Sequence, residues 1–305
     1  MTRARLQGRV LVTGASGMLG SQLLLAAPPG VEALGTDLLP APAGHPEVHE
    51  SGVDLADERA VAGLFDRLGP FAGVIHGAAY TAVDKAEEEE ERARLANARV
   101  PEVVALACQR RGIPLVHVST DFVFDGEKRE PYSTEDRPRP LSAYGRTKLE
   151  GELRVLAAHP SGTAIVRTQW LYGPRGRHFP GTILALAAQK SELRVVHDQI
   201  GSPTSTLELA PALWDVLGAP GTGVYHAACE GRASWYEFAV ATLELCGKTT
   251  RVLPCTTAEF PRPATRPAFS VLDCSRLARL RGRSLRPWRE ALGDFLVRES
   301  LLVRR

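Results

Sequence analysis

The sequence predicts a doubly wound α/β fold, in which helices cover both faces of a parallel sheet. Short apolar runs rich in β-branched residues alternate with longer amphipathic stretches through the first half of the chain. A glycine-rich turn joins the first apolar run to the first amphipathic stretch. Tyr144 also stands four residues before Lys148 at the start of a later amphipathic stretch. Together these features predict a cofactor-binding sheet with catalytic residues on one of its helices.

The apolar runs have the length of strands and the amphipathic stretches the length of helices, as in a Rossmann domain. We expect strands near 9–13, 31–36, 73–77, 113–119 and 163–168, and helices near 18–27, 57–68, 86–111 and 144–158. After about residue 170, Gly- and Pro-rich turns separate helical stretches near 206–217, 234–246 and 287–302. We therefore expect a dinucleotide-binding Rossmann domain with the catalytic residues over 1–170, and a smaller C-terminal, mainly substrate-binding lobe over 171–305, partly interleaved with it.

The composition is that of an ordinary folded protein. The chain has 305 residues, of which 44% are hydrophobic and 24% charged, and its formal net charge is +2. This balance provides no broad basic field for nucleic acid or a membrane surface. The arginines between Arg276 and Arg289 form a local cluster, which we interpret as solvated helix surface.

The five cysteines are widely spaced and include no Cys-x-x-Cys pair. This argues against a disulfide framework and against a zinc site, and we expect no metal. The N-terminus has no signal-peptide pattern, and no stretch approaches 18 uninterrupted apolar residues. We therefore expect a cytoplasmic protein with reduced thiols and no membrane-spanning segment.

The turn after the first strand carries Gly14, Gly17 and Gly20. Glycines here allow a tight turn, close approach of a pyrophosphate to backbone N–H groups, and near contact of helix and strand. The start of the following helix also favours the phosphate charge. We expect the residues between and beside these glycines to contact the dinucleotide as well, namely Ser16, Met18 and Leu19.

Asp37 ends the second predicted strand, where a carboxylate can accept hydrogen bonds from the adenosine ribose and repel a 2′-phosphate. No Arg follows within several residues, so we expect NADH to be accepted at least as well as NADPH. A role for Asp37 in capping its own loop is the alternative. Asp54 and Leu55 follow a short strand and are placed to reach the adenine, although Asp54 could instead cap a helix.

Small residues close the strand near 73–77, where Gly77 is followed by Ala78, Ala79 and Tyr80. They would let a cofactor lie across the strand ends. The strand near 113–119 ends in Ser119 and Thr120, so hydroxyls also stand at this carboxyl edge. We expect the edge to form the ligand site.

Tyr144 and Lys148 lie one helical turn apart, so they share a face of the predicted helix. An unperturbed phenol has a pKa of about 10. We expect the Lys148 ammonium to make the Tyr144 phenol more acidic and to hold the nicotinamide ribose. A hydroxyl from Thr120 can bond the substrate carbonyl or the phenol. The alternative is an exposed helix turn with no catalytic role.

Several further motifs complete a resemblance. With the glycine turn, they make the chain resemble the dTDP-4-dehydrorhamnose reductase family, which belongs to the extended short-chain dehydrogenases/reductases. The matching segments are Ala78–Glu87, Ser119–Gly126, Tyr144–Lys148, Arg167–Gly173, Asp198–Thr204 and Arg266–Asp273.

The resemblance implies hydride transfer from NADH or NADPH to the C4 ketone of a dTDP-linked 4-keto-6-deoxy sugar. It implies Thr120, Tyr144 and Lys148 as the catalytic set and Asn97 as a residue near the cofactor. On residue chemistry alone, Trp170 is more often a core residue and Arg266 a surface charge. The resemblance nevertheless places both on the substrate side, with further contacts from Lys85, Asp121 and Gln199.

One segment departs from the family pattern. Where the family commonly has Gly-x-Asn-Phe, this chain has Gly176, Arg177, His178 and Phe179. An imidazole therefore replaces an amide expected near the nucleotide sugar, which leaves the nucleotide open. His178 can still donate one hydrogen bond.

A non-catalytic alternative comes from the same resemblance. The regulatory subunit of methionine adenosyltransferase is similar to this family too, so a binding subunit is the second reading. Retention of Thr120, Tyr144 and Lys148 favours the enzyme. The Phe122 position, where a dehydratase of the superfamily typically has Glu, favours plain ketone reduction. A homodimer is expected from the family resemblance alone.

Overall fold

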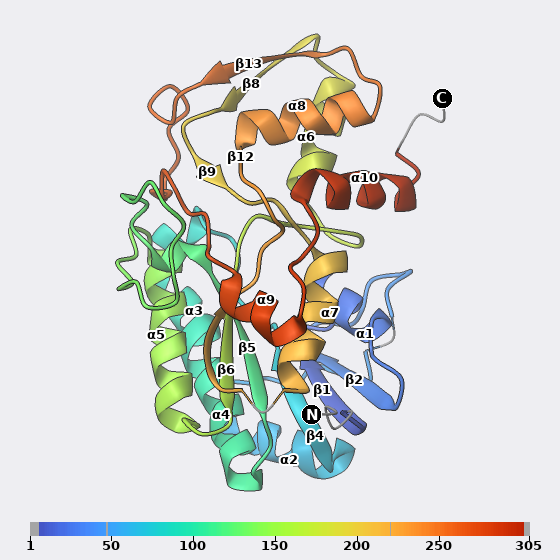
Figure 1. Cartoon of the computed structure of the whole chain (residues 1–305). Coiled ribbons are helices and arrows are strands. Elements are labelled where there is room, and N and C mark those ends of the chain that lie inside the picture. The colour runs from blue at the N-terminus through green and yellow to red at the C-terminus, as the bar shows by residue number, and fades with distance from the viewer. Residues whose placement is uncertain (1–5, 47, 220, 302–305) are drawn as a thin grey trace.

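The computed structural model describes residues 6–46, 48–219 and 221–301. Within this part of the chain, seven parallel strands form the central sheet in the order β3-β2-β1-β4-β5-β6-β11 (Figure 1). The strand order reverses direction between β1 and β4, which opens a crevice at their carboxyl ends. The predicted doubly wound sheet is confirmed. Its strands are β1 (Gly8–Thr13), β2 (Val31–Asp37), β3 (Glu50–Ser51), β4 (Phe71–His76), β5 (Leu115–Thr120), β6 (Thr163–Thr168) and β11 (Gly223–His226).

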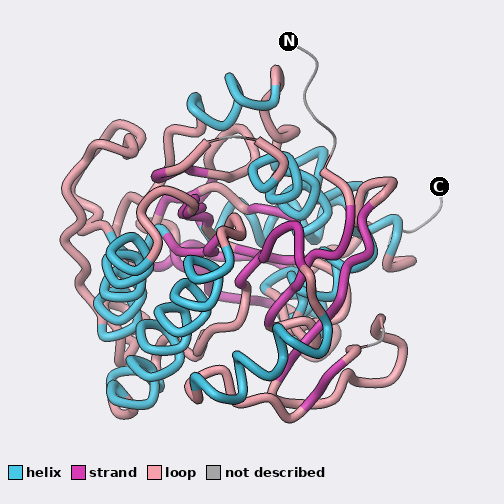
Figure 2. The backbone as a smooth tube through the Cα atoms, turned by 90° about the horizontal axis from the view of Figure 1, so that it is seen from below, coloured by secondary structure: helices cyan, strands magenta, loops and turns pink. Residues whose placement is uncertain are grey.

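Helices cover both faces of this sheet (Figure 2). Alternate residues of β1 show the two cores, because Val12 packs on one side and Leu11 on the other. Each core is apolar and buried, as expected for a sheet covered on both faces. One face carries α1 (Met18–Leu25), α7 (Thr206–Leu217) and α9 (Ser275–Arg281), and the other carries α2 (Glu58–Leu68), α4 (Val100–Arg111) and α5 (Ala143–Ala158).

The prediction of a single helix over 86–111 is wrong in one respect, because the segment is divided into several shorter helical elements. A 3-10 turn (Lys85–Glu87) and α3 (Glu90–Arg94) lead into a π-helical turn (Leu95–Arg99) before α4. The wide turn brings the Asn97 carbonyl against α5 at Gly151, where a Cβ atom would collide with it. Glycine in α5 therefore makes room for the π turn, and apolar periodicity does not report such contacts.

The second part of the chain contributes to two layers. α7, β11 and α9 pack in or on the central sheet. The remainder forms a smaller lobe above the sheet, around an aromatic core that includes Tyr172 and Phe238 (Figure 1). The lobe contains α6 (Phe179–Ala187), α8 (Trp235–Leu245), α10 (Trp288–Arg298) and the parallel pair β8 (Glu192–Val196) and β13 (Arg251–Cys255).

Short strands connect the lobe to the sheet. β7 (Leu171–Tyr172) pairs with β10 (Thr204–Ser205), and β9 (Ile200–Gly201) pairs with β12 (Ala233–Ser234). The predicted helices near 206–217, 234–246 and 287–302 are confirmed as α7, α8 and α10, and the prediction at position 302 lies outside the described residues. No helix in the described segments combines the length and apolar character needed to cross a membrane.

A buried ion pair ties α5 to β6. Arg167 on β6 donates from Nε and Nη2 to the two carboxylate oxygens of Glu152 at 2.9 and 2.7 Å. The side chains are 4% and 2% exposed. Glu152 lies one turn beyond Lys148, so this pair holds the helix that carries both predicted catalytic residues.

Glu152→Gln should lower the free energy of unfolding by about 3–5 kcal/mol, because it leaves the Arg167 charge buried without its partner. Glu150→Gln on the same helix is the matched control, since Glu150 forms partly exposed pairs with Arg94 and Arg154 and should cost less than about 1 kcal/mol. Urea unfolding of both variants measures the difference. Equal, small losses would contradict this account of α5.

Candidate active site

The glycine turn has the shape that a dinucleotide site requires. Gly14 adopts φ +70°, and a Cβ atom there would lie 2.7 Å from the Ala78 nitrogen. At Gly20 a Cβ atom would collide with the Gly14 carbonyl. Gly17 caps α1 without a side-chain hydrogen bond, so the N–H groups of the first turn face the crevice edge uncapped. The backbone here fits a bound pyrophosphate.

Asp37 lies beside this turn at the end of β2. Its Oδ2 accepts hydrogen bonds from the Ser16 nitrogen at 3.0 Å and from the Ser16 hydroxyl at 2.5 Å. Its Oδ1 accepts from the Leu39 nitrogen at 3.3 Å, so the carboxylate also caps its own loop. Leu38 and Leu39 are 62% and 66% exposed, an apolar surface next to Asp37 that could cover an adenine and that sequence reasoning missed.

The helix-cap alternative for Asp54 is wrong, because α2 is capped by Asp57, which accepts from the Arg59 nitrogen at 2.8 Å. Asp54 instead accepts from the Ala56 nitrogen at 2.9 Å within its loop. Leu55 is buried in the core beneath α2. A ligand near this loop would therefore meet the Asp54 side chain and the backbone of Leu55.

Asn97 positions the segment that follows β4. Its Oδ1 accepts from the Tyr80 nitrogen at 2.8 Å, and its Nδ2 donates to the Tyr80 carbonyl at 3.1 Å and to the Thr147 hydroxyl at 3.2 Å. Ala78 and Ala79 are thereby held over the strand ends. The Tyr80 hydroxyl points to α3, where it donates to Glu89 at 3.0 Å.

The catalytic residues predicted from the sequence lie together at the end of β5 and the start of α5. Ser142 caps α5 by accepting from the Gly145 nitrogen at 3.2 Å. The Thr120 hydroxyl acts to lower the pKa of the Tyr144 phenol, which places the two groups close together. Lys148 is 3% exposed and donates from Nζ to the Val118 carbonyl at 2.8 Å. The ammonium thus has donors left for a ligand such as the nicotinamide ribose.

The acidic phenol that we expected does not occur in the structure. Burial raises the pKa of Tyr144 to about 12, with Thr120 acting in the opposite direction and the Asp121 charge adding to the rise. Burial lowers the pKa of Lys148 to about 8, although Glu152 opposes this. The phenol is therefore neutral near pH 7, which is the form that can donate a proton to a ketone.

Two buried imidazoles under α5 carry no charge. His76 and His117 stack with their ring centres 5.3 Å apart. Burial and the neighbouring Lys148 charge lower the pKa of His76 to about 3 and that of His117 well below its ordinary value. Among the described residues of this buried layer, Lys148 is therefore the one cation next to the phenol, and the Glu152–Arg167 pair beyond it is neutral as a unit.

Asp121 is a buried carboxylate beside Thr120, with 1% of its surface exposed. Its Oδ1 accepts from the Thr120 hydroxyl at 3.1 Å. Its Oδ2 is buried and has no hydrogen-bond partner within the described ranges. Burial raises the pKa of Asp121 to about 7.

Two of the predicted substrate residues are already engaged by other side chains. Arg266 forms a bidentate pair with Asp84 at 2.9 and 3.0 Å, next to Lys85. Gln199 donates to the Thr257 hydroxyl at 2.9 Å. Both side chains therefore brace loops.

Trp170 is strained and stacked. It has φ +48°, a left-handed conformation that is costly for a large side chain. Its ring stacks on Trp235 with centroids 3.6 Å apart, and a Cβ atom at Gly201 would lie 2.5 Å from it. Trp235 and Gly201 are neighbours of Trp170 that sequence reasoning missed.

His178 caps α6, because its Nδ1 accepts from the Gly181 nitrogen at 3.0 Å. Burial lowers the pKa of His178, so the ring is neutral near pH 7. With Nδ1 acting as acceptor, the proton is on Nε2. The imidazole thus keeps one donor, as expected from the sequence.

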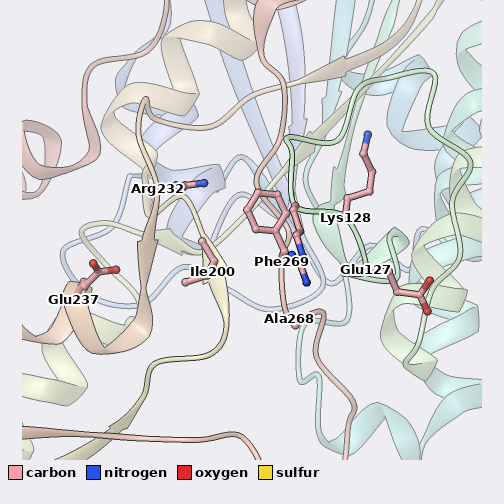
Figure 3. A pocket seen from close by; sticks show the side chains of 9 residues that line it. Glu127, Lys128, Ile200, Arg232, Glu237, Ala268 and Phe269 are labelled. Atoms are coloured by element: carbon pink, nitrogen blue, oxygen red, sulfur yellow. The ribbon is translucent and has the colours of Figure 1, made fainter.

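A surface pocket of about 630 Å³ is lined by residues of both parts of the chain (Figure 3). Phe269 and Ile200 contribute to it, together with Arg232. Ser270, which follows Phe269 in the sequence, donates to Gln169 Oε1 at 3.2 Å.

No group of three or more His, Cys, Asp or Glu side chains in the described segments is arranged to hold a metal ion. The site has a glycine turn whose backbone fits an anion, a carboxylate at the end of β2, and a neutral phenol one helical turn from a buried ammonium. These are the parts that a nicotinamide-dependent reductase needs.

Comparison with known proteins agrees with this arrangement. A family model described as the RmlD substrate binding domain matches residues 8–300. The chain is 43% identical over 304 residues to a dTDP-4-dehydrorhamnose reductase of Mycolicibacterium smegmatis, covering 97% of this chain and 88% of that protein. It is also 41% identical to a probable dTDP-4,6-dihydroxy-2-methyloxan-3-one 4-ketoreductase of Streptomyces antibioticus, covering 97% of this chain and 99% of that protein.

A solved structure is similar over nearly the same length. It is the dTDP-4-dehydrorhamnose reductase of Bacillus anthracis in complex with NADP, with a TM-score of 0.88, 35% identity, and coverage of 96% of this chain and 99% of that chain. The match in sequence, fold and site shows that this chain belongs to the dTDP-4-dehydrorhamnose reductase family.

Proposed function

We propose that the chain reduces the C4 ketone of a dTDP-linked 4-keto-6-deoxy sugar, giving dTDP-L-rhamnose or a close relative. The observation that carries this proposal is the neutral, partly buried Tyr144 phenol close to Thr120, with Lys148 one turn away. Relatives named as dTDP-4-dehydrorhamnose reductases match most of the chain. Both NADH and NADPH are proposed as cofactors, with NADH used at least as well.

In this reaction the nicotinamide cofactor supplies the hydride to C4. The Thr120 hydroxyl and the Tyr144 phenol both bond the ketone oxygen and fix its orientation. Tyr144 then gives its proton to that oxygen as the C–O double bond becomes a single bond, so an alcohol and a phenolate result. The Lys148 ammonium stabilises the phenolate and so lowers the barrier for proton transfer from the phenol to the ketone oxygen.

The substrate side is proposed from the groups left available above the sheet. The free Oδ2 of Asp121 accepts a sugar hydroxyl, and the Nε2–H of His178 donates to the nucleotide sugar. Trp170 packs against the bound nucleotide. The remaining proposed contacts are Lys85, Gln199 and Arg266, and the residues after 170 supply most of this surface.

Phe122 favours reduction over dehydration. It occupies the place beside Asp121 where a dehydratase needs a second acid/base group, and its ring packs edge-on against Tyr144 at 5.5 Å between centroids. An aromatic ring cannot transfer a proton, so elimination of water from the sugar lacks one of its two required groups.

We further propose that the chain acts in the cytoplasm as a homodimer. Its five cysteines are free thiols, as is usual under reducing conditions. The dimer rests on the family resemblance, and sedimentation of the purified chain measures it.

The purified chain should oxidise NADH when a dTDP-4-keto-6-deoxy sugar is added, with the reduced sugar identified by NMR. Tyr144→Phe should lower kcat by about 100-fold or more, because general-acid catalysis is lost, without changing the melting temperature by more than a few degrees. Tyr236→Phe is the matched control on α8 and should keep full activity. The function would be refuted if the wild-type chain reduced none of the 4-keto sugars in a panel of different nucleotides.

The turnover rate should fall as the pH rises through about 8, because Lys148 has its pKa lowered to about 8 and loses its charge above that value. The phenol stays protonated over this range. Measurement of kcat at saturating substrate between pH 6 and 10 tests this, with thermal unfolding over the same range as the control for denaturation. A rate that stays level up to pH 10 would contradict the role of Lys148.

Asp121→Asn should stabilise the fold at pH 8 while weakening substrate binding. The folded-state pKa of about 7 lies above the ordinary Asp value of 3.8, so the destabilisation by Asp121 is absent below 3.8, grows as the pH rises and is complete above 7. The gain should reach on the order of 4 kcal/mol. Urea unfolding at pH 5 and pH 8 measures it, and a gain that does not grow with pH would exclude a buried charge as the cause.

A further inference from the structure

The loop from Gly173 to Arg177 crosses from the small lobe to the cofactor side of the sheet. Arg175 donates from Nε to the Gly44 carbonyl at 3.3 Å, across 131 residues of sequence. The next residue, Gly176, packs so closely on Met18 that a Cβ atom would lie 2.7 Å from the Met18 Cβ. Two consecutive loop residues thus touch the first residue of α1 and the loop that follows β2.

These two contacts bracket the place of the adenosine ribose. Met18 begins the helix whose N-terminus faces the pyrophosphate, and Gly44 lies in the loop that begins after Asp37. Asp37 itself bonds Ser16, two residues before Met18. A ribose hydrogen-bonded to Asp37 would therefore lie at the rim that Arg175 spans.

The backbone of Arg175 is strained, with φ +62°. A non-glycine residue is disfavoured in this conformation, although glycines stand nearby at Gly173 and Gly176. The Gly44 hydrogen bond is long and exposed, so it offsets little of this cost. The strain therefore points to a use for the side chain at this place.

The Arg175 guanidinium also has unused capacity. Within the described residues it bonds the Gly44 carbonyl through Nε and pairs with no carboxylate. Its two Nη groups carry four of the five guanidinium N–H donors, in the planar arrangement that matches a phosphate. Anchoring through Nε leaves that pair of groups for a bidentate contact.

We infer that Arg175 is a specificity residue for the cofactor and binds the 2′-phosphate of NADPH. This inference rests on the proposed use of a nicotinamide cofactor. Asp37 favours the free ribose hydroxyl of NADH and repels a 2′-phosphate, and Arg175 offsets that repulsion. The chain then binds both cofactors at the same rim, through Asp37 for the ribose hydroxyl of NADH and through Arg175 for the 2′-phosphate of NADPH. The arginine missing after Asp37 in the sequence is thus supplied by a distant loop.

The test measures binding of two pairs of ligands that differ by the 2′-phosphate, which are NADPH with NADH and 2′,5′-ADP with 5′-ADP. Arg175→Gly tolerates the left-handed backbone and should weaken NADPH and 2′,5′-ADP by about 10- to 100-fold, with NADH and 5′-ADP changed by less than about twofold. Arg175→Lys should fall between, because it keeps the charge without the planar donor pair. Arg177→Ala, an exposed arginine of the same loop, is the matched control and should change none of the four ligands.

Equal weakening of all four ligands in Arg175→Gly would overturn the inference, since it would show that the loop acts only as a wall of the groove. Unchanged binding of all four would overturn it as well. Calorimetry needs no sugar substrate, so a chain that discriminates these ligands as expected but reduces no 4-keto sugar would refute the proposed reaction and leave the assignment of Arg175 standing.

Discussion

The hydrogen bond from Lys148 Nζ to the Val118 carbonyl is the contact on which the active site depends. It fastens the first turns of α5 to the end of β5, so a phenol on the helix and a hydroxyl on the strand face the same space. It also keeps an ammonium in a place from which burial would otherwise exclude it. Glu152, fixed by Arg167, lies one turn further along the same helix and opposes the loss of that charge. The same contact therefore fixes both the position of the proposed catalytic side chains and the charge beside them.

Each titratable group around this contact is held in a state that suits reduction. Burial keeps Tyr144 neutral, and it keeps His76 and His117 neutral too, so positive charge is concentrated on Lys148. Asp121 is costly to ionise where it lies, and its Oδ2 has no hydrogen-bond partner among the described residues. Such a group is retained at a cost in stability when binding needs it.

Local sequence patterns predicted the strands and most helices of the sheet, because apolar periodicity and glycine turns act over a few residues. The same local reasoning placed Thr120, Tyr144 and Lys148 correctly on adjacent elements. It could not predict the π turn at Asn97, since that turn depends on the absence of a side chain at Gly151 on another helix.

Other long-range contacts could not be predicted either, because they join segments that are far apart in the sequence. β11 is only four residues long, and nothing near it in the sequence indicates that it pairs with β6. The expectation of an acidic phenol was wrong because spacing shows that Tyr144 and Lys148 are neighbours and does not show how deeply they are buried. Arg175 likewise contacts the loop after β2, and no local pattern predicts this contact because Arg175 and Gly44 are 131 residues apart in the sequence.

The position of β11 bears on how the molecule can be divided. A fragment that stopped after β6 would keep every proposed catalytic side chain, yet β6 would become an open border with unpaired backbone groups, and the sheet would lose α7 and α9 from one face. Exposed borders of this kind recruit other chains and promote aggregation. The first 170 residues and the rest of the chain therefore have to fold together, and a change in the loops of the small lobe disturbs the sheet less than an exchange of the whole second part.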